Sequence, residues 1–242
     1  MWTTEDLLWL TTNYPSLKQK TSNIIEGRLS FRMLRLNGKY VVNPGSDLLA
    51  RTKTKDYLYI FDTYNVRIEW KKDHTLPIVF ETGGKLADVA KLLNKRLIDM
   101  HQFEDGALCL ASPIELRRAF PDKVKLDILI ENFVIPYLFA QSYFAKHKKW
   151  IWGDLSHGYW GLIEWLGQQS RYDDDETKEI HNLLWDYGNN DDIALVLGIR
   201  YRAYKPCLCM SGKKVRECHP YRQLGLARIR GAIARGVINV KK

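Results

Sequence analysis

Three cysteines and a histidine lie close together near the end of the chain, in a spacing suited to metal binding. They are Cys207, Cys209, Cys218 and His219, in the pattern Cys-x-Cys, eight intervening residues and then Cys-His. Zinc takes four thiolate or imidazole ligands in a tetrahedron. With all four positions filled by the protein, the sequence predicts a structural Zn²⁺ site rather than a catalytic one. The alternative is a set of unrelated surface thiols.

The residues between these cysteines strengthen the prediction of a zinc site. Ser211-Gly212-Lys213-Lys214 provides a turn and positive charge, which lowers the cost of gathering thiolates. Through this core and the cysteine spacing, the segment resembles the SEC-C zinc-binding motif. The same motif occurs at the C-terminus of the protein-export ATPase, where it serves docking. The resemblance implies a zinc knuckle that recruits a partner or a substrate, and whose metal folds a segment too short to form its own core.

The fourth cysteine, Cys109, stands apart from the cluster and needs its own explanation. It follows a turn-forming sequence, Asp105-Gly106, and His101 lies a few residues earlier. A single cysteine after a glycine turn with a histidine nearby is a candidate nucleophile. The alternative is a buried, inert cysteine between Leu108 and Leu110, because free cysteines are often buried.

The first third of the chain predicts the elements that position Cys109. An apolar helix begins the chain, and alternating apolar and polar residues then indicate successive strands. Asn37-Gly38 is typical of a hairpin turn. The expected helix is Thr4–Leu10, and the expected strands are Arg28–Phe31, Lys39–Val42, Tyr57–Trp70 and Pro77–Thr82.

The rest of the chain predicts helices, with a kink at Pro136 in the longest of them. An antiparallel meander sheet followed by helices that pack on it defines the α+β class, with a small zinc knuckle at the C-terminal end. The expected helices are Lys85–Lys95, Lys125–Lys146, Trp160–Gln168, Glu176–Tyr187 and a basic amphipathic helix over Arg222–Arg235.

This order of elements, with Pro77 leading the last strand and Asp105–Leu110 carrying the cysteine, resembles the ubiquitin-conjugating enzymes over residues 4–150. It looks closest to the divergent bacterial members found in ubiquitin-like conjugation operons linked to antiviral defence. The resemblance implies that Cys109 accepts the C-terminus of a ubiquitin-like protein as a thioester and passes it to a target amine. It also implies three protein partners: the ubiquitin-like protein, an ATP-consuming activating enzyme and a substrate with an acceptor lysine.

The chain departs from this family at His101. The eukaryotic enzymes carry a His-Pro-Asn signature whose Asn lies eight residues before the cysteine, and His101 occupies that position with no proline after it. In the family the Asn stabilises the oxyanion or holds the active-site loop. An imidazole can donate to developing negative charge or help to deprotonate the incoming amine. We therefore expect His101 to be catalytic beside Cys109, with an ordinary loop histidine as the alternative.

The charge and the predicted elements divide the chain into three parts. We expect a ubiquitin-conjugating-like catalytic domain over 1–168, a helical linker over 169–198 and a basic knuckle with its helix over 199–242. The net charge of +9 comes from the tail, because residues 198–242 hold 12 Lys and Arg and a single acid. A basic tail can bind nucleic acid, bind an acidic partner or simply face solvent. Since the preceding residues carry slightly more acids than bases, nucleic-acid binding is not favoured for the main body.

The sequence also indicates the cellular compartment of the protein and excludes some classes of chemistry. The longest uncharged apolar run, residues 132–145, is too short to cross a bilayer, and residues Glu5 and Asp6 stand where a signal peptide would be basic. We therefore expect a cytoplasmic protein with reduced thiols and no membrane partner. The sequence has neither a phosphate-binding glycine loop nor a nucleophile elbow. The remaining alternatives are a catalytically idle adaptor of the same fold and a basic nucleic-acid-binding zinc-knuckle protein.

Overall fold

The computed structural model describes residues 2–36, 39–51, 57–72, 74–152, 159–187, 204–207 and 212–238. The chain forms two compact units, Met1–Gly153 and Asp154–Lys242. The first contains an antiparallel sheet with helices and the second contains helices, so the predicted α+β class is confirmed. The predicted first domain extends to residue 168, and the division into compact units falls before α7 (Tyr159–Gln168).

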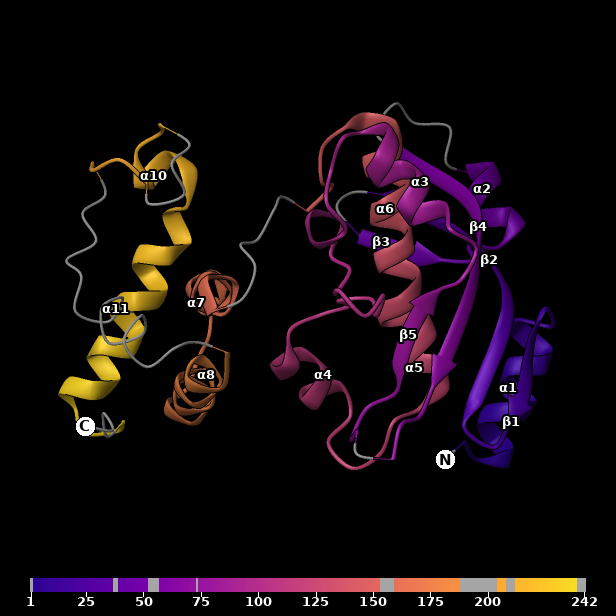
Figure 1. Ribbon diagram of the computed structural model, residues 1–242, viewed down its shortest axis with the longest axis horizontal. Helices are drawn as coiled ribbons and strands as arrows, with labels where there is room; N and C mark the ends of the chain where they lie inside the picture. Colours follow the sequence, from indigo (N-terminus) through magenta and orange to yellow (C-terminus); the bar gives the residue numbers. More distant parts are fainter. Residues whose placement is uncertain are drawn as a thin grey trace. The chain divides into compact units, whose positions relative to one another are not determined.

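The sheet of the first unit consists of strands that follow one another in the sequence (Figure 1). Its order is β1-β2-β4-β5, and β3 pairs with the second half of β2. The pairing of β2 with β4 is unbroken from Ile24 opposite Glu69 to Leu36 opposite Tyr57. The strands are β1 (Leu17–Thr21), β2 (Ile24–Leu36), β3 (Lys39–Val42), β4 (Tyr57–Glu69) and β5 (Ile78–Glu81).

Alternation of side chains explains why these strands form and which face they bury. In β4, Tyr64, Val66 and Ile68 are buried, while Asn65 between them is exposed. Strand β1 is not among the predicted strands. Only Leu17 of that strand is buried, because β1 lies at the edge of the sheet and carries polar side chains that give no apolar alternation.

The helices of the first unit follow the predicted order. The first helix is α1 (Thr4–Asn13), whose cap is Thr3 in a reciprocal pairing with Asp6. The unit also contains shorter helices and one long helical segment. They are α2 (Ser46–Arg51, between β3 and β4), α3 (Lys85–Leu92), the 3₁₀ turn η1 (Leu97–Met100), α4 (Pro113–Ala119), α5 (Leu126–Leu129), the π-helical η2 (Ile130–Val134) and α6 (Ile135–His147).

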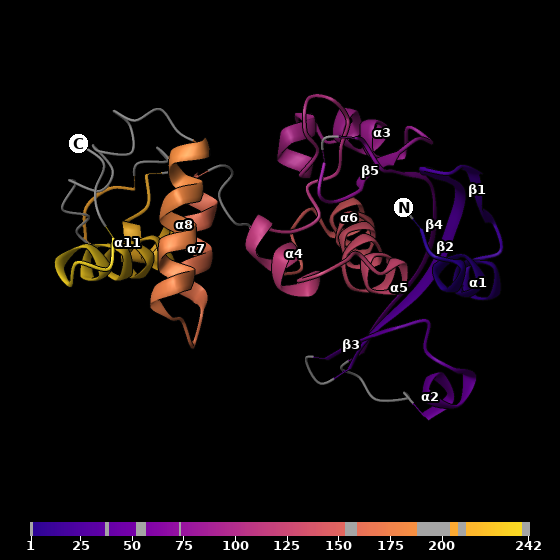
Figure 2. The same cartoon turned by 90° about the horizontal axis from the view of Figure 1, so that it is seen from below.

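The π-helical turn in the long segment lies directly before Pro136. Proline has no backbone N–H and cannot make the ordinary helical hydrogen bond. The hydrogen bonds before it change to the wider π-helical pattern, and the helix continues. The segment Leu126–His147 is long and apolar enough to span a membrane by length and composition, but 56% of its most apolar window is buried inside the protein. It lies along one face of the sheet, as a core helix does (Figures 1 and 2).

The second unit is built around a very close crossing of two helices. It contains α7, α8 (Asp174–Tyr187), the short α10 (Val215–Cys218) and α11 (Pro220–Ala234). A Cβ atom on Gly225 of α11 would lie 1.9 Å from the carbonyl oxygen of Ile163, and one on Gly167 of α7 would lie 2.0 Å from that of Tyr221. The two backbones therefore touch through glycines, and this contact holds α11 against α7.

Gly225→Ala is expected to separate α7 from α11, because the added methyl group would clash with a backbone oxygen. A backbone oxygen cannot move aside as the end of a side chain can. We expect a loss of about 3 kcal/mol in the stability of this unit, measured as lost amide hydrogen-exchange protection in both helices of the full chain. Gly231→Ala on the same helix is the matched control. Its Cβ would meet only the flexible end of Arg235, and a gain of about 0.5–1 kcal/mol is expected there. Equal protection in the two variants would contradict the glycine contact.

Candidate functional site

Cys109 follows a small hairpin whose turn contains Asp105 and Gly106. The Gly106 N–H donates to the carbonyl of Phe103 at 2.9 Å, and the Phe103 N–H donates to the carbonyl of Ala107 at 2.8 Å. Gly106 has φ +86°, a left-handed conformation that favours glycine. The Asp105 carboxylate accepts the Ala107 N–H at 3.0 Å. The predicted turn is therefore confirmed, with a specific role for each of its residues.

This hairpin is attached to the edge of the sheet. Ala107 forms an antiparallel bridge with Phe80 of β5, and the Leu108 N–H donates to the carbonyl of Val79 at 2.8 Å. The side chain of Leu108 enters the core. Cys109 therefore lies immediately beyond a backbone segment that the last strand holds in place.

The backbone also joins Cys109 to His101, the two predicted catalytic residues. The Cys109 N–H donates to the His101 carbonyl at 2.9 Å. His101 itself has φ +53°, and its ring packs edge-on against Trp150 with the ring centres 4.9 Å apart. The structure thus brings the two residues together through main-chain contact and gives the imidazole an aromatic neighbour.

Two polar side chains of α6 hold the turn that presents His101. The Tyr137 hydroxyl donates to the Met100 carbonyl at 2.9 Å and lies 3.2 Å from the His101 carbonyl oxygen. One helical turn later, the Gln141 amide donates to the Met100 carbonyl at 2.6 Å. This pair is not among the predicted functional residues. Its signal is two polar side chains four residues apart on the buried face of an otherwise apolar helix.

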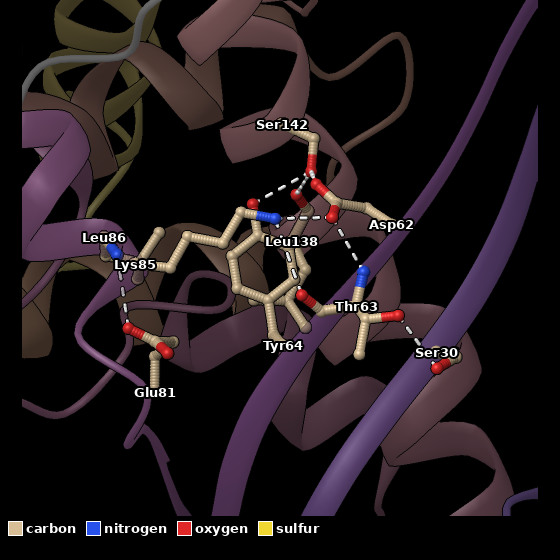
Figure 3. Close-up of polar contacts among 9 residues, drawn as sticks. All are labelled: Ser30, Asp62, Thr63, Tyr64, Glu81, Lys85, Leu86, Leu138 and Ser142. Atoms are coloured by element: carbon tan, nitrogen blue, oxygen red, sulfur yellow. Dashed lines mark hydrogen bonds and ion pairs between the residues drawn. The ribbon is translucent and has the colours of Figure 1, made fainter.

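The next face of α6 is tied to the sheet by a polar network (Figure 3). Ser142 donates to the Asp62 carboxylate at 2.6 Å and lies 2.9 Å from the Tyr64 hydroxyl. Lys85 of α3 pairs with Asp62, and its ammonium group lies 4.1 Å from the centre of the Tyr64 ring. Burial raises the pKa of Asp62, but hydrogen bonds from Lys85 and Ser142 outweigh it and hold that pKa below its usual value. The network fixes α6, and with it Tyr137.

The Cys109 thiol is partly buried and not activated by its surroundings. Burial raises its pKa, and the nearby Glu115 carboxylate raises the pKa further. The thiol is therefore mostly protonated near neutral pH, and thiolate has to form when a reaction partner arrives.

The predicted metal ligands meet in the second unit. The ligand atoms of Cys207, Cys218 and His219 all lie within 4.8 Å of one another, and the Cys207 Sγ is 3.2 Å from the His219 Nδ1. In a tetrahedral zinc site, bond lengths of about 2.0–2.3 Å place such atoms about 3.5 Å apart. These three residues can therefore hold a metal ion. Cys209, the fourth predicted ligand, lies outside the described residues.

Backbone pairing brings the two ends of this metal motif together. The Cys207 N–H donates to the Lys213 carbonyl at 2.8 Å, and the Val215 N–H donates to the Lys205 carbonyl at 3.0 Å. The short α10 then ends at Cys218. His219 is the capping residue of α11, so both of these ligands come from the junction of two helices.

A buried charged group of α7 faces the metal ligands. Glu164 pairs with Arg222 of α11 at 2.5 Å, and its carboxylate oxygen lies 3.7 Å from the His219 Nε2. The Arg222 guanidinium also lies 4.6 Å from the centre of the Trp160 ring. Glu164 is not among the predicted functional residues. Its signal is a single acid in the otherwise apolar helix Tyr159–Gln168.

Comparisons with known proteins give no match: no family model fits the chain, and no curated protein or solved structure is similar to it. The chemistry of both sites has to be inferred from their own residues and geometry.

Alkylation of Cys109 is expected to accelerate with pH and still to be rising at about pH 9, because its thiol pKa is raised. Glu115→Gln removes the negative charge but keeps the shape of the side chain, so it should lower that pKa and speed alkylation about two- to five-fold at pH 8. The measurement is the rate of iodoacetamide labelling of the Cys109 peptide by mass spectrometry. Glu104→Gln, at an exposed position in the hairpin, should leave the rate unchanged. A plateau near pH 7 would contradict the raised pKa.

Proposed function

We propose that the protein is a ubiquitin-conjugating-type enzyme that carries a ubiquitin-like protein as a thioester on Cys109. The single observation that carries the proposal is the placement of Cys109. It is a partly exposed free thiol just beyond the last strand of an antiparallel sheet, held by the His101 carbonyl. A helix, a sheet of sequential strands, the cysteine and then helices are the order that the ubiquitin-conjugating fold requires.

The proposed reaction consists of two acyl transfers. The Cys109 thiolate attacks the carbonyl carbon of a thioester between the ubiquitin-like protein and the activating enzyme, and the cysteine of that enzyme leaves as a thiolate. An acceptor lysine amine then attacks the new thioester on Cys109. The amine gives up a proton, Cys109 leaves as a thiolate and an isopeptide bond remains. ATP is consumed only by the activating enzyme.

His101 is proposed to assist both steps by holding the cysteine loop and by hydrogen bonding to the oxyanion. The first role is supported by its carbonyl, which accepts the Cys109 N–H. The second requires the imidazole to donate to the developing negative charge. The packing of the ring against Trp150 restricts where that donor can point.

The proposed setting is bacterial antiviral defence in the cytoplasm. It rests on the resemblance to conjugating enzymes of antiviral operons, as do the three partners: a ubiquitin-like protein, an activating enzyme and a substrate with an acceptor lysine. The basic C-terminal knuckle is proposed to recruit a partner or a substrate to the catalytic domain.

A second candidate function is that of a catalytically idle adaptor with the same fold. The burial of Cys109 and its raised pKa favour this candidate, because an inert cysteine needs no thiolate. A nucleic-acid-binding role is supported only by the basic charge of residues 198–242.

We further propose that the metal is a structural Zn²⁺ ion bound by Cys207, Cys209, Cys218 and His219. The thiolate and imidazole donors of the three described ligands support zinc over magnesium or calcium, which prefer oxygen ligands. When bound, the ion would join the loop at Cys207 to the start of α11.

Incubation with ATP, a ubiquitin-like protein and its activating enzyme should give a covalent adduct that reductant cleaves. Cys109→Ala should abolish the adduct, and Cys109→Ser should give an oxyester that resists reductant. Cys207→Ala keeps Cys109 and should keep the adduct. Failure of the folded wild-type chain to accept the acyl group from a charged activating enzyme would support the adaptor instead.

The purified full chain is expected to contain about one equivalent of zinc, measured by elemental analysis. Cys218→Ser should release it, because three ligands hold zinc much less tightly than four. Cys109→Ser replaces a cysteine outside the cluster and should retain the metal. Zinc retained in full by Cys218→Ser would contradict the ligand assignment.

A further inference from the structure

Glu164 is a buried carboxylate that the proposed thioester chemistry does not use. Its side chain is 3% exposed and that of its partner Arg222 is 4% exposed. Removing two charges from water costs several kcal/mol of solvation, and the attraction within such a pair recovers this only with good geometry. A buried pair at this point in the fold therefore calls for an explanation beyond the stability of the helices.

The position of Glu164 relative to His219 supplies that explanation. The two ring nitrogens of His219 face different groups: Nδ1 lies 3.2 Å from the Cys207 sulfur, and Nε2 lies 3.7 Å from the Glu164 carboxylate. A neutral imidazole has one nitrogen that donates a proton and one that offers a lone pair. A carboxylate beside Nε2 favours the tautomer with the proton on Nε2, which leaves the Nδ1 lone pair directed at the thiolate cluster.

We propose that Glu164 is an outer-sphere positioning residue of the metal centre, which orients His219 so that Nδ1 binds the ion. This role rests on the proposed metal site. Carboxylates that accept the second N–H of a metal-bound histidine fix its ring and increase its strength as a ligand. Arg222 donates to the same carboxylate oxygen that lies beside His219, and its guanidinium lies against the Trp160 ring.

This arrangement makes α7 a part of the metal centre. Glu164 comes from α7, whereas His219 and Arg222 lie at the start of α11. The same two helices are in backbone contact through Gly167 and Gly225. Metal binding at His219 and the packing of α7 against α11 therefore reinforce each other.

The test compares zinc affinity in the full-length wild type, Glu164→Gln, Glu164→Ala and Arg222→Met, by competition with a chromophoric chelator. We expect a loss of roughly 10–100-fold for Glu164→Ala, and a smaller loss for Glu164→Gln, whose amide oxygen still accepts a hydrogen bond. Arg222→Met breaks the same buried ion pair but keeps the carboxylate beside His219. It should lower thermal stability with a smaller loss of affinity than Glu164→Ala.

A second readout separates orientation from stability. In the zinc-bound wild type, ¹⁵N NMR of the His219 ring should show a metal-bound Nδ1 and a protonated Nε2. Glu164→Ala should shift the Nε2 proton resonance or change the ligating nitrogen, whereas Arg222→Met should keep the wild-type pattern. Affinities within two-fold of wild type and an unchanged ring pattern in both Glu164 variants would overturn the proposed role. A folded wild-type chain that takes up no zinc would overturn the metal proposal, and this role with it.

Discussion

The hydrogen bonds from α6 to the carbonyls of Met100 and His101 are the contacts on which the cysteine loop depends. Tyr137 and Gln141 are buried donors, and the carbonyls that they reach precede the hairpin. An unpaired buried donor or acceptor costs about 1–3 kcal/mol. Moving either the helix or the turn away would therefore leave the side-chain donors and the carbonyls unpaired at that cost. Since the His101 carbonyl also accepts the Cys109 N–H, the long core helix fixes the backbone of the candidate nucleophile.

The same burial that fixes the loop works against its chemistry. A desolvated thiol beside Glu115 loses its proton reluctantly, and thiolate is the reactive form. A carrier can tolerate this, because a partner can change the electrostatic environment on docking and because a poor free nucleophile escapes unwanted oxidation and alkylation. An idle cysteine never has to form a thiolate. The two candidate functions therefore differ in whether a docked partner raises the reactivity of Cys109, rather than in the structure of the isolated chain.

The sequence predicts the local features of both sites better than the contacts that support them. The Asp105-Gly106 turn, the alternation of β4 and the Cys-His spacing are set by residues close in sequence, and the structure has each of them. Strand β1 is missed because an edge strand needs no apolar alternation. The sequence predicts an irregularity at Pro136, but its form as a π-helical turn depends on packing. The predicted catalytic and metal roles go further than fold or spacing, and they stay predictions.

Glu164 and Tyr137 show why the supporting residues are hard to read from sequence. Each is a polar residue in an apolar helix, a pattern that also describes an ordinary partly exposed side chain. What distinguishes them is a partner far along the chain: Met100 for Tyr137, and His219 with Arg222 for Glu164. In both cases a helix contributes a buried polar side chain that contacts a short segment distant in sequence. The chain thus places its candidate nucleophile and its candidate metal ligands by the same physical means, with helices restraining the segments that carry them.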